Sequence, residues 1–165
     1  MSYPAQRDSL HHSLVRSILE YTATIWDPHL LKDIRALEGV QRKAARYVKH
    51  DYSRYSSVTT MLQDLGWTSL QDRRRNLRLA LFYKVAHELI AVPAAELDLE
   101  KPVRDTRSNH IYKYRELSAN TSELKNSTVH RTIPQWNKLP ARAAEAESLA
   151  SFKAQLTRPE GHTSA

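Results

Sequence analysis

Hydrophobic and polar positions follow a helical period along the first quarter of the chain. Apolar residues recur every three or four positions from Asp8 to Trp26, and again from Pro28 to Lys49. Asp27 and Pro28 separate the two segments, because proline suits the first turn of a helix and aspartate suits the cap before it. The pattern predicts two consecutive helices, the second beginning at Pro28 with Asp27 as its cap.

Two further helices are predicted before the pattern weakens. The first, Val58–Leu65, ends at Gly66, because glycine readily adopts the left-handed conformation that terminates helices. The second covers Ser69–Ala91 and can begin with a capping box. The box is formed either by Ser69 with Asp72 or by Thr68 with Gln71. Its second half is apolar on almost every side, which is typical of a helix at the centre of a core.

Beyond residue 92 the pattern is irregular. Tyr112, Tyr114 and Leu117 alternate with polar residues, which indicates one short β-hairpin or, alternatively, a loop laid over the core with buried tyrosines. Trp136 is expected to anchor a compact apolar turn before a last short helix. We therefore expect a mainly α fold: a helical bundle (1–92), a basic linker or hairpin (93–128), an apolar turn and helix (129–158) and a disordered tail (159–165).

Positive charge is concentrated rather than spread evenly. The chain of 165 residues has a formal net charge of +7. Residues 1–50 carry a net +3 and residues 101–142 a net +6, whereas residues 51–100 and 143–165 each carry a net −1. Concentrated positive charge favours a polyanionic partner. The alternative is a basic protein without a specific partner.

Several classes of function lack their characteristic residues. The chain contains no cysteine, which excludes disulfides and thiolate zinc sites. It has no apolar run of about 18 residues and no signal-peptide pattern at its start, so we expect no membrane partner and an intracellular location, nuclear or cytoplasmic. Polymerase or nuclease chemistry needs converging carboxylates, and none are grouped here. We expect no cofactor, no metal site and no catalytic residue.

A basic ridge is predicted on the helix that ends at Lys49. Arg35, Arg42, Arg46 and Lys49 are spaced 7, 4 and 3 residues apart, so they lie on one helical face. Such a ridge can contact phosphates, although charged ridges are more often ordinary solvated faces. The near absence of acidic residues on this face favours phosphate binding.

A second group of candidate phosphate contacts lies in the first turns of the helix after Gly66. Arg73, Arg74 and Arg78 stand near the helix N-terminus, where positive charge opposes the helix dipole. Something must offset that cost. Either a phosphate backbone or acidic neighbours within the fold could do so.

A third group mixes basic and aromatic side chains. Arg107, His110, Lys113 and Tyr114 fall within ten residues of one another. Cations that meet phosphates and rings that stack on bases suit a single nucleic-acid strand. Trp26, Trp67 and Trp136 are expected to serve packing, and His87 on the apolar helix is expected to be structural.

Seven strings form an ordered set along the chain. They are SLVRSILEYTATIWDPH (Ser13–His29), LEGVQRKAARYV (Leu37–Val48), DYSRYSSVTTMLQDLGWTSLQDRR (Asp51–Arg74), LALFYKVAHELIAVP (Leu79–Pro93), TRSNH (Thr106–His110), RTIPQWNKLP (Arg131–Pro140) and SLASFKAQL (Ser148–Leu156). In this order they resemble the C-terminal region of LINE-type, non-LTR retrotransposon reverse transcriptases of the jockey-like and chicken-repeat-like kind. The resemblance extends from about residue 10 to about residue 156.

The resemblance implies a thumb-like helical bundle that grips template–primer, RNA or an RNA–DNA hybrid, with low sequence specificity. The aspartates that hold metal ions in the palm of this family have no counterpart here, which implies a non-catalytic fragment. Ser127, Thr128 and Val129 stand where the family often has aromatic residues. The alternatives are a helical protein-interaction fragment that docks on a polymerase palm, or a functionless relic.

Overall fold

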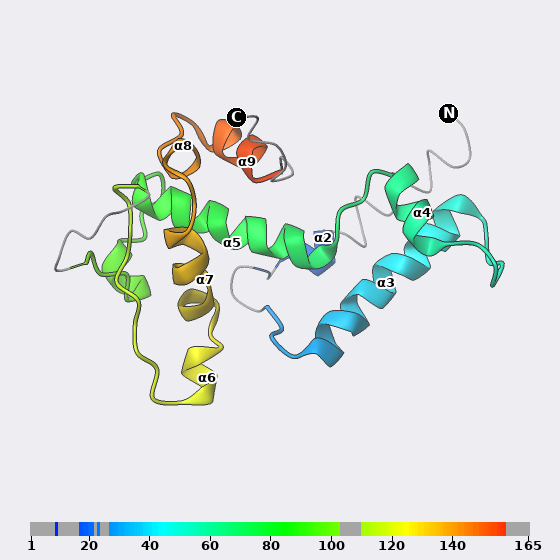
Figure 1. Ribbon diagram of the computed structural model, residues 1–165, viewed down its shortest axis with the longest axis horizontal. Coiled ribbons are helices and arrows are strands. Elements are labelled where there is room, and N and C mark those ends of the chain that lie inside the picture. Colours follow the sequence, from blue (N-terminus) through cyan, green and yellow to red (C-terminus); the bar gives the residue numbers. More distant parts are fainter. Residues whose placement is uncertain (1–8, 10–16, 22, 24–26, 103–109, 158–165) are drawn as a thin grey trace, which may run out of the picture. The chain divides into compact units, whose positions relative to one another are not determined.

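The computed structural model describes residues 9, 17–21, 23, 27–102 and 110–157. Those residues are mainly helical and include no strand, which confirms the mainly α fold (Figure 1). Trp26, Arg107, most of the first predicted helix and the predicted disordered tail lie outside them. None of the described helices is long and apolar enough to cross a membrane.

The chain divides into two compact units, residues 1–75 and residues 76–165. The boundary falls within one helix, α5 (Leu70–Ala86). The sequence had suggested a division near residue 92. The difference arises because the apolar residues Leu79 and Phe82 of α5 belong to the same core as Trp136, so this half of the helix groups with the C-terminal residues.

The first unit contains α2 (Ser17–Tyr21), α3 (Leu31–Lys49) and α4 (Val58–Asp64). Helices α3 and α4 lie against each other (Figure 1). Their small core is formed by the buried side chains of Ala45, Val48, Val58, Met61 and Trp67. The prediction that Trp67 serves packing is therefore confirmed.

The start of α3 differs from the prediction. The helix begins at Leu31, and its cap residue, Leu30, makes no side-chain capping bond. Asp27 does not cap this helix, because its carboxylate pairs with the guanidinium of Arg74 at 3.0 Å. The assignment of Asp27 as the cap was wrong for a physical reason: an ion pair with a residue 47 positions away takes its carboxylate.

Four segments end in the same way, with one residue in the left-handed conformation. These residues are His50, Gly66, Glu88 and Asp98, with φ angles between 53° and 64°. At each, the residue and its successor donate backbone hydrogen bonds to carbonyls three and five positions back, as a Schellman motif requires. Gly66 ends α4 as predicted. Glu88 ends α5 earlier than predicted, because its left-handed conformation stops the helical pattern after Ala86.

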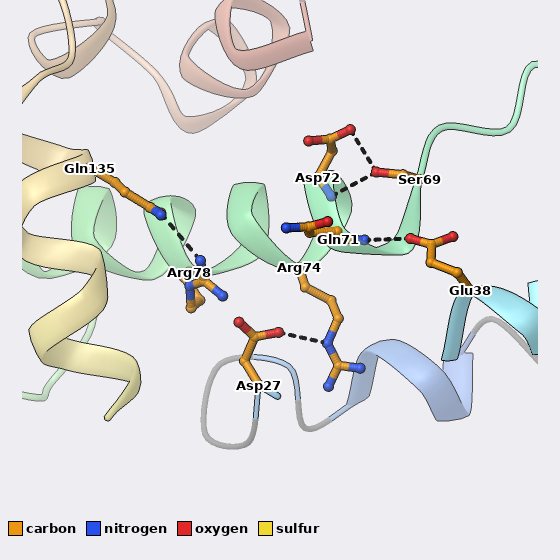
Figure 2. A network of polar contacts seen from close by, with 8 residues as sticks. All are labelled: Asp27, Glu38, Ser69, Gln71, Asp72, Arg74, Arg78 and Gln135. Carbon is orange, nitrogen blue, oxygen red and sulfur yellow. Dashed lines mark hydrogen bonds and ion pairs between the residues drawn. The ribbon is translucent and has the colours of Figure 1, made fainter. Parts of the chain in front are cut away.

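The beginning of α5 follows the prediction. The hydroxyl of Ser69 accepts a hydrogen bond from the backbone N–H of Asp72 at 3.0 Å and donates one to its carboxylate at 2.6 Å. This is the predicted capping box of Ser69 with Asp72 (Figure 2).

The core of the second unit is built around α5. Phe82 and Tyr83 of α5 are fully buried together with Trp136 and Phe152. The ring centroids of Phe82 and Trp136 are 6.1 Å apart, and those of Tyr83 and Phe152 are 4.6 Å apart. The central position predicted for this helix is confirmed. His87 is structural, as expected, since it stacks on Tyr83 at 4.1 Å.

The C-terminal elements that cover α5 are short helices. The residues predicted as an apolar turn form a helix that contains Pro134. Ser127 begins it, because its hydroxyl accepts a hydrogen bond from the backbone N–H of His130. Trp136 and Leu139 are buried, which confirms the anchoring role. The elements of this region are η2 (Ala94–Leu97), α6 (Ser122–Lys125), α7 (Thr128–Asn137), α8 (Ala141–Ala144) and α9 (Leu149–Thr157).

Residues 110–119 run without regular structure, so the described part of this segment contains no hairpin. Two residues at the end of α7 hold it instead. Asn137 exchanges two hydrogen bonds with the backbone of Tyr114, at 3.0 and 2.8 Å. Trp136 donates from Nε1 to the carbonyl of Tyr112 at 2.6 Å. The sequence pattern also allows a loop with buried tyrosines instead of the hairpin. Tyr114 is buried, which agrees with that alternative.

Candidate nucleic-acid interface

Helix α3 presents an exposed basic face. It carries six basic and two acidic side chains in 19 residues. Arg35, Arg42 and Lys49 are seven residues apart, so they fall within a narrow sector at about 100° per residue, and all three are exposed. The buried side chains Gln41, Ala45 and Val48 lie on another side of the helix. The predicted alignment on one face therefore holds.

Two lysines that the sequence reading passed over widen this face. Lys32 and Lys43 are exposed and lie within about 80° of Arg35 around the helix, by the same rotation per residue. Gly39 lies between them, and a Cβ atom there would meet nothing within 4 Å. The centre of the face is therefore bare backbone flanked by cations.

The two acidic residues of α3 form no ion pair with the cations of this face among the described residues. Asp33 lies about 160° from Arg35 around the helix. Glu38 lies about 60° from Arg35, at the edge of the face, and its carboxylate accepts the backbone N–H of Gln71 at 3.0 Å, in the first turn of α5 (Figure 2). A carboxylate at a helix N-terminus is stabilised by the helix dipole. Within the described part of the chain, Arg35, Arg42 and Lys43 have no ion pair.

Two residues of the predicted ridge are engaged inside the fold. Arg46 donates from Nη1 to the carbonyl of Ser53 at 2.8 Å and, at a longer 3.4 Å, to that of Asp51. Lys49 forms an ion pair of 3.2 Å with Asp64 of α4, in which both side chains are partly exposed. Arg46 therefore holds the chain that follows α3, whereas Lys49 remains accessible because exposed ion pairs exchange at low cost.

The arginines at the start of α5 have acidic neighbours. Arg73 pairs with Glu20 of α2. Arg74 pairs with Asp27 at 3.0 Å, and their side chains are only 3% and 8% exposed (Figure 2). Burial lowers the pKa of Arg74, and the nearby carboxylate of Glu20 acts in the opposite direction. Internal acids, the alternative to a phosphate, therefore account for these two arginines.

Arg78 belongs to the second unit and is buried among its helices. Its guanidinium donates to the side-chain oxygen of Gln135 at 3.2 Å (Figure 2). Burial lowers its pKa to about 10, and the positive charge of Arg131 adds to this shift. A buried guanidinium cannot reach a phosphate unless the surrounding helices move.

The third predicted group is covered in the same way. The Nε2 atom of His110 lies 3.0 Å from the carbonyl of Trp136, and the side chain is buried. Burial lowers the pKa of His110, so the neutral ring donates this hydrogen bond. Tyr114 is buried and Lys113 is half-buried. Arg107 lies outside the described residues.

Sequence reasoning missed the loop between α3 and α4, residues 50–57. Tyr52 is 61% exposed and Tyr55 is 93% exposed, and Arg54 between them is also exposed. The signal was in the sequence, since HDYSRYSS interleaves aromatic and basic residues as residues 107–114 do. In residues 110–114 the fold covers Tyr114, whereas in this loop it exposes both tyrosines.

The second unit also contains an open pocket of about 440 Å³ beside α7. Lys125, His130 and Arg131 line it together with Glu116, so its charge is mixed. No three His, Cys, Asp or Glu side chains gather as a metal site within the residues that the structure describes.

Comparison with known proteins gives no family assignment. No protein-family model, no curated protein and no solved structure matches the chain.

The structure thus restricts the predicted interface. The cations predicted to contact phosphates on α3 and on α5 are not all exposed. Arg73 and Arg74 are instead engaged with acids, and Arg78 is buried. This outcome favours the interaction alternative as far as α5 is concerned. The exposed cations that remain together are those of α3.

Proposed function

We propose that the chain is a non-catalytic nucleic-acid-binding module whose α3 face grips the phosphates of RNA or of an RNA–DNA hybrid. The observation that carries the proposal is the exposed row of Arg35, Arg42 and Lys43 on α3, none of which forms an ion pair in the described part of the chain. Contacts between cations and phosphates carry little sequence information, so binding should depend strongly on salt and weakly on sequence.

The family context is part of this proposal. The ordered strings that resemble the C-terminal region of LINE-type reverse transcriptases would make α3 part of a thumb that holds template–primer beside a palm. The palm aspartates of that family have no counterpart in this chain, so the module would contribute grip and no chemistry.

The bare backbone at Gly39 supports the same function. A glycine inside a helix costs about 1 kcal/mol relative to alanine, and packing within the fold does not require it here because a Cβ would meet nothing. A residue without a side chain lets a phosphate backbone approach the helix closely.

The runner-up is a fragment that docks on a polymerase palm through an apolar patch. Such a patch should gather exposed apolar side chains on one side of a helix. On α3 the exposed residues Val40 and Tyr47 are seven positions apart and share one side of the helix, whereas the exposed Leu31 is nine positions from Val40 and lies opposite. Two such side chains form only a small patch, so the apolar exposure of α3 supports this alternative less than its row of cations supports phosphate binding.

Binding to an RNA–DNA hybrid over a series of salt concentrations tests the proposal. Fluorescence anisotropy at about 50 and 200 mM salt should show a steep loss of affinity, with a slope of about 0.9 in log K per phosphate contact. A folded, monodisperse sample that does not bind at low salt would leave the docking fragment or the functionless relic.

A further inference from the structure

The loop 50–57 is held in place by a network of its own. The guanidinium of Arg46 donates to the carbonyl of Ser53 at 2.8 Å. The backbone N–H of Ser53 donates to the carboxylate of Asp51 at 3.0 Å, and the N–H of Tyr55 donates to the hydroxyl of Ser53 at 3.2 Å. A side-chain hydrogen bond from Ser56 lowers the pKa of Asp51 most, and the bond from the backbone N–H of Ser53 lowers it further. The loop is therefore pinned to the C-terminal turn of α3.

The tyrosines project from this pinned loop without cover. Tyr55 is 93% exposed, and Tyr52 is 61% exposed with its ring edge-on to His50 at 6.0 Å between centroids. A loop that is fixed by hydrogen bonds does not need exposed aromatic rings for its own stability. Aromatic rings on a fixed support are instead suited to stacking, because little conformational entropy is lost when a flat ligand binds.

The loop continues directly from the basic face. Lys49 ends α3, and His50 turns the chain into the loop through its left-handed conformation. Arg54 adds an exposed cation between the two rings. The carboxylate of Asp51 is engaged within the loop, where it accepts the backbone N–H of Ser53 at 3.0 Å. Cations next to stacking rings are the combination that binds single strands without sequence preference.

We propose that Tyr52 and Tyr55 form a stacking platform for unpaired bases of a single strand whose phosphates lie along α3. This inference rests on the proposed function and deepens it. It states that the protein binds unpaired nucleotides as well as a duplex. Bases within a duplex are stacked on one another, so the platform distinguishes an overhang or single strand from paired nucleic acid.

The test compares the full-length chain with the Tyr52→Ala/Tyr55→Ala variant and with Tyr52→Phe/Tyr55→Phe, which keeps the rings. The probes are a single-stranded RNA of about 12 nucleotides, the same strand with a central abasic tract, and a blunt RNA–DNA hybrid. Anisotropy is measured at one low salt concentration. Circular dichroism checks that each variant is folded, which is expected because both side chains are exposed.

The alanine variant should bind the intact single strand about 5- to 150-fold more weakly for each base that loses a ring. The phenylalanine variant should bind it as the wild type does. The abasic strand should bind the wild type and the alanine variant equally, because its phosphates remain and its bases are gone. Binding of the blunt hybrid should not change in either variant.

The outcomes separate the two proposals. Equal binding of the intact single strand by the wild type and the alanine variant overturns the platform, and the proposed function stands if the hybrid still binds with strong salt dependence. Equal loss on the intact and abasic strands also overturns it, since stacking cannot explain that loss. If no probe binds at low salt, the phosphate grip on α3 fails, and the platform fails with it.

Discussion

Replacing Arg74 with methionine should destabilise the first unit and leave nucleic-acid binding unchanged. The guanidinium of Arg74 lies 3.0 Å from the carboxylate of Asp27, and the two side chains are 3% and 8% exposed. Methionine keeps most of the aliphatic volume but leaves a buried carboxylate without this partner. The sequence alone would assign Arg74 to phosphate binding. A phosphate contact predicts weaker nucleic-acid binding with unchanged stability, whereas the internal ion pair predicts lower stability with unchanged binding.

The magnitude follows from the burial of the pair. Breaking a buried ion pair by removing one partner costs roughly 3–5 kcal/mol, because the remaining charge stays desolvated. Asp27 retains slight exposure, so the lower end of that range, about 3 kcal/mol, is expected. Adding Asp27→Asn to Arg74→Met should recover more than about half of the loss, because an amide costs less to bury than a carboxylate that has lost the guanidinium of Arg74.

Urea denaturation followed by circular dichroism and tryptophan fluorescence measures this change, with an unchanged slope as the sign that only stability has altered. Arg75→Met is the matched control. It removes the same charge from the neighbouring position of α5, where the side chain is exposed, and should shift stability by less than about 0.5 kcal/mol. A loss of affinity for nucleic acid with unchanged stability in Arg74→Met would refute the internal role.

Four further substitutions test other features of the structure. Gly39→Ala should raise the free energy of unfolding by about 1 kcal/mol, read from the urea midpoint, because a Cβ meets nothing there; a destabilised variant would contradict the open space. Glu88→Gly should raise the free energy of unfolding by about 0.5–1 kcal/mol, and Gly66→Ala should lower it by about 1 kcal/mol, because the backbone is left-handed at both positions. Changes of the opposite sign would argue against these helix ends. His110→Gln should flatten the loss of stability on acidification from pH 7 to 5. Because the pKa of His110 is lowered in the folded protein, the unfolded chain binds a proton there first, below about pH 6.5. If the melting temperatures of wild type and variant changed equally with pH, this reasoning would be contradicted.

The helices were predictable because their signals are local. The apolar residues around Phe82 specify a buried helix by their spacing alone, and Ser69 and Gly66 mark helix ends by their own chemistry. The end of α5 was missed because its left-handed residue is Glu88, a type that does not mark helix ends. The helix at Pro134 was read as a turn because proline usually breaks helices.

The candidate interface was only partly predictable because charge partners are not local. The spacing of Arg35 and Arg42 fixes a common face wherever α3 forms. The partner of Arg74 is 47 residues away in sequence, and no periodicity connects the two. His110 resembled a surface cation in the sequence, yet Trp136 covers it in the fold. Tyr52 and Tyr55 are interleaved with basic residues in the sequence, as the third predicted group is. Whether a loop exposes its rings depends on tertiary packing, which that pattern does not specify.

The most direct test of the central claim compares Arg42→Ala with Arg142→Ala in binding to an RNA–DNA hybrid. Both arginines are exposed, and each substitution removes one positive charge, but only Arg42 lies on the basic face of α3. Anisotropy titrations over a salt series should show weaker binding and a salt slope reduced by about 1 for Arg42→Ala, with little change for Arg142→Ala. Equal effects of the two substitutions, or none from Arg42→Ala, would contradict phosphate binding by α3.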